Sequence, residues 1–236
     1  MPKPQPTRTP PPARRGDPTA RSSRRAAPPG RPRRSLWSWT WAAPIAGIVG
    51  LLGILIWSGV AGTSATGAST GITYQVGRPG PGQAAPPIKL QSTAGGTFSL
   101  AAEHGHSVLL FFQEGVACEP CWTQMTDIKR DWSSFRQLGV SQLVTITPDP
   151  VAVLRQKVAE EGITTPVLAD PDNLIANAYG ATEYGMHPGT SGHSFVLVGP
   201  TGRIEWRGDF GGAPDYTMYV PVANLITDLS RAIHHE

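Results

Sequence analysis

The sequence has little cysteine, with only Cys118 and Cys121 among its 236 residues. Two cysteines allow at most one disulfide within the chain, which excludes the small secreted scaffolds held together by several disulfides. Charge is also scarce, because only 16% of the residues are Asp, Glu, Lys or Arg. No charged residue at all occurs between Arg34 and Arg78. A gap of that length makes a membrane-spanning segment a hypothesis to consider.

The charges that are present are unevenly distributed. Residues 1–35 hold ten Lys and Arg, ten Pro and a single acid, Asp17. Residues 36–236 hold ten Lys and Arg against 16 Asp and Glu, a net charge of −6. Because the globular part is acidic, a basic nucleic-acid-binding domain is excluded as the simplest interpretation. Residues 1–35 have almost nothing apolar to bury, so we predict a disordered Arg/Pro-rich tail in the cytoplasm.

Residues 36–62 are predicted to form a transmembrane anchor that contacts the lipid bilayer. They include an apolar run of 21 residues, 42–62, and about 20 apolar residues span a bilayer core. Tryptophans precede the run and recur near its far end, as interfacial anchors do. Because arginines precede the run, we expect a single pass through a bacterial-type plasma membrane, with the N-terminus cytoplasmic and the remaining chain outside. A signal peptide cleaved near residues 62–68 is the alternative.

The rest of the chain divides into a linker and one domain. Residues 63–82 are small, polar and rich in glycine, which predicts a flexible linker. Residues 83–236 alternate strand and helix patterns, which predicts an α/β domain with a central mixed sheet between helices. The expected strands are 88–90, 97–100, 107–113, 142–147, 166–168, 195–198 and 203–207, and the expected helices are 118–138, 150–161, 172–179 and 218–234.

The two cysteines form a CxxC motif where a buried strand should end and a helix begin. Residues 107–113, SVLLFFQ, are nearly all apolar, and from Trp122 to Leu138 apolar residues recur at spacings of three and four. A thiolate at a helix N-terminus is stabilised by free N–H groups and the helix dipole, which lowers its pKa. We therefore expect Cys118 to be the exposed nucleophile and Cys121 the buried resolving thiol. Pro120 is tolerated in the first turn and stiffens it.

Three other interpretations of the cysteine pair stay open. The pair could be half of a zinc site, although a second Cys pair is missing. It could be an inert structural disulfide. It could also bind copper together with a histidine such as His193. Redox exchange is the interpretation that best fits a CxxC at a strand-to-helix junction, and it requires no metal and no cofactor.

The domain resembles the thioredoxin-like superfamily, in the redoxin branch that joins the peroxiredoxins of the AhpC/TSA family to exported TlpA/ResA-like thiol–disulfide oxidoreductases. The resemblance spans about 80–234 and rests on 82–100, on 107–121 with the CxxC, on PVLADP at 166–171 with Ala-Tyr-Gly at 178–180, and on the late hairpin at 195–202. It implies a thioredoxin-like fold and a thiol-dependent redox activity, and it suggests Glu114 as an acceptor, through water, for the proton of Cys121. A solvated loop acid is the alternative for Glu114.

The sequence departs from both branches at informative positions. Peroxiredoxins carry Pro seven residues and Thr or Ser three residues before the reactive cysteine, where this chain has Phe111 and Gly115. Thioredoxin-type reductants carry a cis-proline just before the late strand, where this chain has His193. His193 would tune the thiolate or relay protons, and an ordinary surface histidine is the alternative.

The leading hypothesis is a membrane-tethered, extracytoplasmic thiol–disulfide oxidoreductase. Its substrate would be a protein disulfide, and a membrane-bound or soluble thiol would donate the electrons. The runner-up is an antioxidant peroxidase in which peroxide oxidises Cys118 and Cys121 resolves the sulfenic acid. A Sco-like copper-delivery module is a third hypothesis, although its Cys spacing is one residue longer.

Overall fold

The computed structural model describes residues 65–68, 72–187 and 189–234. The predicted tail, 1–35, and the predicted anchor, 36–62, lie outside the described residues. Among the helices that are described, none is long and apolar enough to cross a membrane. The described residues all fall within one compact unit, Val60–Glu236.

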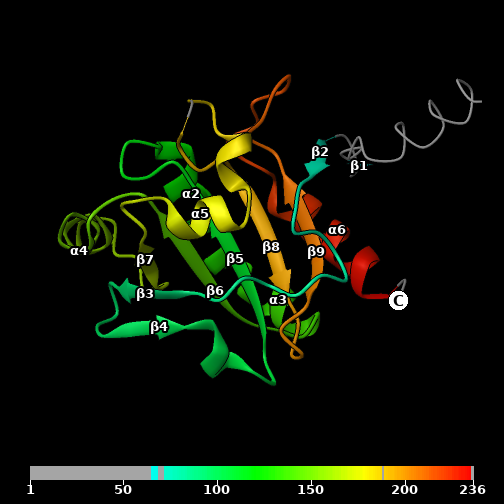
Figure 1. Cartoon of the computed structure of the whole chain (residues 1–236), viewed down its shortest axis with the longest axis horizontal. Coiled ribbons are helices and arrows are strands. Elements are labelled where there is room, and N and C mark those ends of the chain that lie inside the picture. Colours follow the sequence, from blue (N-terminus) through cyan, green and yellow to red (C-terminus); the bar gives the residue numbers. More distant parts are fainter. Residues whose placement is uncertain (1–64, 69–71, 188, 235–236) are drawn as a thin grey trace, which may run out of the picture. The chain divides into compact units, whose positions relative to one another are not determined.

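A mixed sheet of nine strands, counted over the described residues, forms the centre of the domain (Figure 1). Its spatial order is β1-β2-β9-β8-β5-β6-β7-β3-β4. Strands β5, β6 and β7 are parallel neighbours, and the other pairs are antiparallel, so the predicted mixed sheet is confirmed. The strands are β1 (Ala65–Ala68), β2 (Thr73–Val76), β3 (Lys89–Ser92), β4 (Thr97–Ser99), β5 (Ser107–Phe112), β6 (Val140–Thr147), β7 (Val167–Ala169), β8 (Ser194–Val198) and β9 (Ile204–Asp209).

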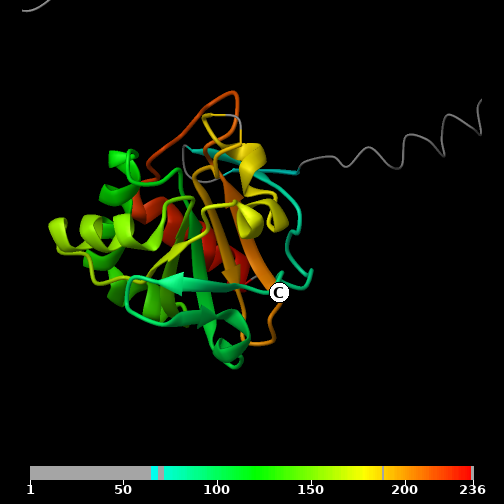
Figure 2. The same ribbon diagram turned by 60° about the vertical axis from the view of Figure 1, so that its left-hand side comes forward.

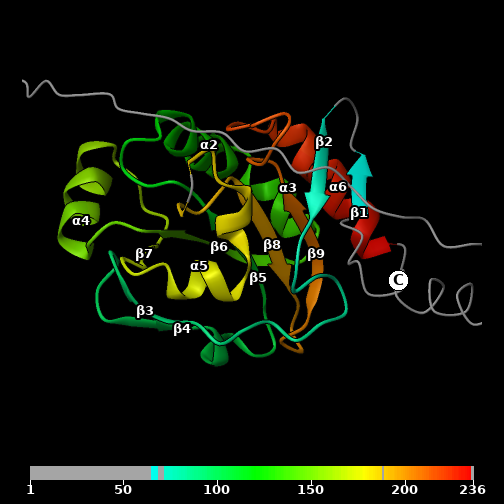
Figure 3. The ribbon, with the colours of Figure 1, turned by 45° about the horizontal axis from the view of Figure 1, so that its top comes forward.

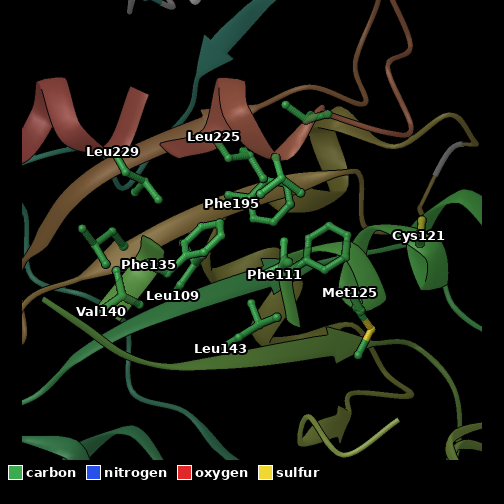
Figure 4. Close-up of a cluster of buried hydrophobic side chains, with 14 of the residues drawn as sticks. Leu109, Phe111, Cys121, Met125, Phe135, Val140, Leu143, Phe195, Leu225 and Leu229 are labelled. Atoms are coloured by element: carbon green, nitrogen blue, oxygen red, sulfur yellow. The ribbon is translucent and has the colours of Figure 1, made fainter. Parts of the chain in front are cut away.

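Strand β5 is buried on both faces, as its apolar sequence predicts. Successive side chains of a strand point to opposite faces, so Leu109 and Phe111 join one hydrophobic cluster and Leu110 and Phe112 the other. Figure 4 shows Leu109 and Phe111 within the first cluster. The strand is therefore held by cores on both sides, which fixes the position of the loop at its carboxyl end.

Helices cover both faces of the sheet. Helices α2 (Glu119–Arg130), α3 (Trp132–Gln137), α4 (Val151–Glu160) and α6 (Val222–His234) pack on the first cluster, and α5 (Leu174–Ala178) packs on the second. Figure 2 shows α5 and α6 on opposite sides of the sheet. Two short 3-10 helices, η1 (Leu100–Glu103) and η2 (Ala181–Tyr184), complete the described elements. The predicted two-sided covering is thus confirmed.

Two predicted helices have different bounds in the structure. The single helix expected over 118–138 is broken at Asp131, whose N–H still bonds to the carbonyls of Asp127 and Lys129. The apolar stripe continues across the break, and Gly139, with φ of 84°, ends it as expected. The last helix begins at Val222 rather than 218, because Pro221 disfavours a helical conformation at Val220 and its carbonyl instead accepts the first hydrogen bonds of the helix, from Asn224 and Leu225.

Within the segment 63–82, where the composition predicts a flexible linker, the structure forms two strands, β1 and β2. Residues Thr73–Val76 form β2, and Gln75 pairs with Asp209 on β9. Figure 3 shows β2 beside β9, with β1 next to β2. The side chain of Tyr74 packs against Trp206 and Phe210, with ring centroids 5.8 and 5.1 Å apart. Composition concealed this strand because its apolar contacts come from one aromatic residue.

A buried ion pair joins this N-terminal segment to the sheet. Arg207 and Asp209 are both inaccessible to solvent, and the guanidinium binds the carboxylate through two hydrogen bonds of 2.7 and 3.0 Å. The guanidinium also donates to the carbonyls of Pro79 and Tyr179, and the carboxylate accepts the N–H of Gly77. The ion pair therefore connects three segments of the chain, which are residues 77–79, the residue Tyr179 and strand β9.

We predict that Asp209→Ala lowers the free energy of unfolding by about 3–5 kcal/mol, because Arg207 would be left buried without its counter-charge. Urea denaturation of the full chain measures the change. Arg130→Ala is the control, since the Arg130 side chain is 69% exposed and its pair with Asp127 should contribute less than about 1 kcal/mol. Equal losses in the two variants would contradict the prediction.

Candidate active site

The two cysteines lie where β5 gives way to α2. Strand β5 ends at Phe112, and α2 begins at Glu119 with Cys118 as its N-cap and Pro120 in the first turn. Cys118 and Cys121 form a disulfide, with 5.3 Å between their Cα atoms. Cys118 is half-buried, whereas Cys121 is completely buried at the end of the first hydrophobic cluster (Figure 4). The sulfur that an external molecule meets first is therefore that of Cys118.

Asp149 shapes the loop between β5 and α2. Its Oδ2 atom accepts hydrogen bonds from the N–H of Val116, at 2.8 Å, and from Thr147 Oγ1, at 3.0 Å. The same oxygen lies so close to Gly115 that a Cβ at that position would overlap it. Gly115 also has a φ of 110°, which only glycine adopts readily. The loop therefore requires glycine at residue 115 for two independent reasons.

His193 contacts the buried sulfur of Cys121. Its Nδ1 atom is 3.6 Å from Cys121 Sγ, and its Nε2 atom is 3.3 Å from Gln124 Oε1. The ring sits edge-on to Phe111 and Phe195, and it has no exposed surface. The interpretation of His193 as an ordinary surface histidine is therefore wrong, because the segment before β8 carries it into the core.

Burial also determines the charge of this histidine. Loss of hydration disfavours the imidazolium and lowers the pKa of His193 from 6.5 to about 3. The unfolded chain thus binds a proton below pH 6.5 that the folded chain does not take up. The stability that neutral His193 contributes is complete above that pH and is lost as the pH falls towards 3. In the disulfide form the ring is neutral throughout the physiological range.

Glu114 has partners away from the cysteines. Its side chain is 12% exposed, one oxygen accepts the N–H of Met186 at 2.6 Å, and the other lies 3.5 Å from His187 Nδ1. Both carboxylate oxygens of Glu114 are thus directed to the segment 186–187 rather than to Cys121, and a fully solvated loop acid does not fit so small an exposed fraction. Glu114 joins the loop before α2 to the segment 186–187.

Two side chains that matter here were not predicted from the sequence. Gln124 is fully buried three residues after Cys121, and its Oε1 accepts the N–H of Val220 at 2.7 Å. Asp149 follows β6 and reaches across to the loop before α2. A glutamine within an otherwise apolar helix stripe is a signal that could have identified Gln124, because a buried amide needs partners. Nothing comparable marks Asp149.

A copper or zinc site at the cysteine pair would need further protein ligands besides the two sulfurs. Within the described ranges there is no group of three or more His, Cys, Asp or Glu side chains arranged to hold a metal ion. The two sulfurs are bonded to each other, and the imidazole of His193 contacts the sulfur of Cys121.

We predict that Gly115→Ala destabilises the fold by about 1–3 kcal/mol more than Gly95→Ala does. Both positions have a φ near 100°, so both variants carry backbone strain, but nothing lies within 4 Å of a Cβ at Gly95. The difference isolates the overlap with Asp149. Chemical denaturation of the two full-length variants measures it, and equal destabilisation would show that Asp149 moves aside freely.

Known proteins share sequence and fold with this chain. Residues 81–207 match the model of the AhpC/TSA family. Two curated proteins from Mycobacterium tuberculosis strains, whose names include the word peroxiredoxin, are 32% identical over 101 residues. The aligned region covers 43% of this chain and 64% of the relatives, so the chain spans less than two thirds of their length.

Solved structures share the fold at low sequence identity. The peroxidoxin BcpB of Mycobacterium tuberculosis superposes with a TM-score of 0.53 and 15% identity, over 66% of this chain and 97% of its own. AhpC of Mycobacterium bovis gives a TM-score of 0.56 and 16% identity, over 66% and 93%. These likenesses confirm the predicted thioredoxin-like α/β fold. With the family model matching more than half of its length, the chain belongs to the AhpC/TSA family.

Proposed function

We propose that this protein is a thiol–disulfide oxidoreductase whose Cys118–Cys121 pair alternates between a disulfide and two thiols. The observation that carries the proposal is the disulfide at the start of α2, with one half-buried and one fully buried sulfur. Membership of the AhpC/TSA family supports a thiol-dependent oxidoreductase in general. The specific reaction is argued from the chemistry of the pair.

Cys118 is suited to be the nucleophile. It is the N-cap of α2, where the helix dipole stabilises a negative charge. This effect lowers the pKa of a thiol and increases its thiolate fraction near neutral pH. Since Cys121 is enclosed by the core, an external disulfide reaches Cys118 first.

The reaction then proceeds by two exchanges. The Cys118 thiolate attacks one sulfur of the substrate disulfide, a mixed disulfide forms, and the other substrate sulfur leaves as a thiolate. Cys121 attacks the Cys118 sulfur, the mixed disulfide breaks, and the second substrate thiol is released. The substrate gains two electrons and two protons, and the protein gains the disulfide. A membrane-bound or soluble dithiol restores the reduced pair.

Peroxide reduction is a second candidate, and the comparisons favour it. The two curated relatives carry the name peroxiredoxin, and the family model is that of AhpC/TSA proteins. In this reaction the Cys118 thiolate takes one oxygen of a peroxide, and Cys121 resolves the sulfenic acid with loss of water. The same two cysteines would serve both substrates.

The surroundings of the cysteines support a disulfide substrate over a peroxide. Phe111, which occupies the position of the peroxiredoxin proline, is buried and stacked on Phe195 at 4.4 Å. Gly115 occupies the position of the hydroxyl residue, and the carboxylate of Asp149 lies against it. A peroxide would meet an acid there in place of a donor, whereas disulfide exchange needs only a thiolate and a resolving thiol.

A single-turnover experiment separates the two substrates. We expect the reduced full chain to be oxidised by a small protein disulfide, and by hydrogen peroxide only at the rate of an ordinary thiol. Each missing transition-state donor costs about 10²–10³ in rate. Cys121→Ser should trap a mixed disulfide on Cys118, and Cys118→Ser should form none. Rapid oxidation by peroxide with little reaction towards the disulfide would make the protein a peroxidase.

We also propose that residues 36–62 anchor the protein in a plasma membrane, with the tail 1–35 in the cytoplasm and the catalytic domain outside. The support is the uncharged apolar run and the arginines that precede it. In this arrangement the bilayer is itself a partner of the chain, and the thiol donor works on the outer side.

Protease accessibility tests this topology. We expect protease added to intact spheroplasts to digest the domain, because it faces the outside, while a cytoplasmic marker protein stays intact. Complete protection of residues 83–236 would contradict the proposed orientation. Release of a soluble mature form would instead establish a cleaved signal peptide.

A further inference from the structure

His193 is a buried titratable group whose purpose the two-cysteine reaction leaves open. Enclosing a polar ring in the core costs free energy unless its nitrogens have partners. Both ring nitrogens do have one, since Gln124 contacts Nε2 and the sulfur of Cys121 contacts Nδ1. The Cys121 sulfur, which takes part in the proposed reaction, therefore lies next to Nδ1 of a fully buried imidazole.

The hydrogen-bond network determines which nitrogen of His193 carries the proton. The backbone N–H of Val220 can only donate, so the Gln124 atom that it contacts at 2.7 Å must be the amide oxygen. The same oxygen lies 3.3 Å from Nε2 of His193, and an acceptor there requires Nε2 to carry the hydrogen. Nδ1 is then unprotonated, and this lone pair is the one that lies 3.6 Å from Cys121 Sγ.

No competing charge faces the ring among the residues that the structure describes. Strand β5 contributes Phe111, β8 contributes Phe195, and α2 contributes Gln124 and Cys121. The segment before α6 reaches the histidine through the Phe210 N–H, which bonds to its carbonyl. Burial is the cause of the lowered pKa, and no charged neighbour contributes to it.

The nearby acids have other partners. Glu114 accepts the N–H of Met186 and lies beside His187, and Asp149 accepts the N–H of Val116. Of the side chains that contact the ring, Cys121 is thus the one that titrates. When the disulfide is reduced, its thiol is the donor that faces the Nδ1 lone pair.

We propose that His193 is the catalytic base that takes the proton of the Cys121 thiol, with Gln124 as the positioning residue that fixes its tautomer. In the resolving step the S–H bond of Cys121 breaks and its proton passes to Nδ1. The Cys121 sulfur bonds to the Cys118 sulfur, the bond from Cys118 to the substrate breaks, and the substrate sulfur leaves with the electron pair. The proton of the imidazolium then neutralises the leaving thiolate.

The inference rests on the proposed dithiol reaction and accounts for how its second half proceeds at neutral pH. Burial in an apolar environment raises the pKa of a thiol, so Cys121 would otherwise react through a very small thiolate fraction. A neutral imidazole in contact with the sulfur removes that limit, because the adjacent thiolate stabilises the imidazolium that forms. In the peroxide reaction the same proton would go to the oxygen that leaves Cys118 as water.

Thionitrobenzoate release measures the two steps separately. One equivalent of 5,5′-dithiobis(2-nitrobenzoic acid), a small aromatic disulfide, is mixed with the reduced full chain in a stopped-flow instrument. The first coloured thiol reports attack by Cys118, and the second reports attack by Cys121 on the mixed disulfide. Each phase is recorded from pH 5.5 to 9.

His193→Phe keeps the aromatic packing and removes both nitrogens. We expect the first phase to be unchanged and the second to slow by about 10²-fold or more near pH 7, as for loss of a general base. The remaining rate should rise about tenfold per pH unit, because it follows the thiolate fraction of Cys121. His104→Phe, at an exposed histidine, is the matched control and should change neither phase.

Gln124 gives a test that does not depend on the folding of the His193 variant. The carboxylate of Gln124→Glu would still accept from Val220 and from Nε2 but would favour the imidazolium. Nδ1 would then be protonated at higher pH, so as the pH falls the fast second phase should be lost at a higher pH than in the wild type. Gln124→Leu should slow the second phase and spare the first. A second phase of wild-type rate and pH profile in His193→Phe would overturn the inference, as would identical profiles for the two Gln124 variants.

Failure of the proposed function gives a different result. If the wild-type chain releases no second thiol, Cys121 does not resolve the mixed disulfide and the dithiol reaction itself is wrong. If the wild-type chain shows both phases and His193→Phe slows both equally with unchanged pH profiles, the histidine is only a structural residue. A selective effect on the second phase supports the inference.

Discussion

The buried pair of Arg207 and Asp209 is the interaction that holds the surroundings of the site together. It joins Gly77 and Pro79, which lie between β2 and β3, to strand β9. Through the carbonyl of Tyr179 it also contacts the segment that leads to β8. The guanidinium also lies over the ring of Tyr184, at 5.8 Å. Gly192 packs so closely on the Tyr184 carbonyl that a Cβ would overlap it, and His193 comes next. The position of the imidazole thus depends on charges in another part of the sheet.

The chemistry of the site divides between a side open to substrate and a closed side. Cys118 faces outwards at a helix N-terminus, where electrostatics favour its thiolate. Cys121 faces a dry region of aromatic rings, where burial keeps the imidazole of His193 neutral. The two sulfurs therefore differ in exposure because Cys118 caps α2 at the loop after β5, whereas Cys121 lies one turn further into the helix and points to the core.

Sequence patterns predicted the fold well where burial is repeated along the chain. The apolar run of β5, the helical stripe after the CxxC and the glycine that ends it all indicated elements that the structure contains. The strand at Thr73–Val76 was missed because its stability comes from pairing with β9 and from one tyrosine. Local composition carries no information about such a distant partner.

Only the part of the candidate site that is local in sequence was predictable. Cys118 and Cys121 are close in sequence, so their pairing on one helical turn followed from spacing. His193 and Asp149 reach the site from segments that follow β7 and β6, and only the tertiary structure shows which of them meets a sulfur. The register with known thioredoxins drew attention to His193, but its burial depends on the loops around Tyr184 and Gly192.

The contact between Gly115 and Asp149 also constrains how this sequence can evolve. A hydroxyl residue at 115 would resemble the peroxiredoxin site, yet its side chain would enter the space of the Asp149 carboxylate, on a backbone that suits glycine. Replacing Asp149 first would free the N–H of Val116 and loosen the loop before any benefit appeared. The two positions are therefore epistatic, and a lineage with this loop can gain a hydroxyl residue at 115 only by changing Gly115 and Asp149 together.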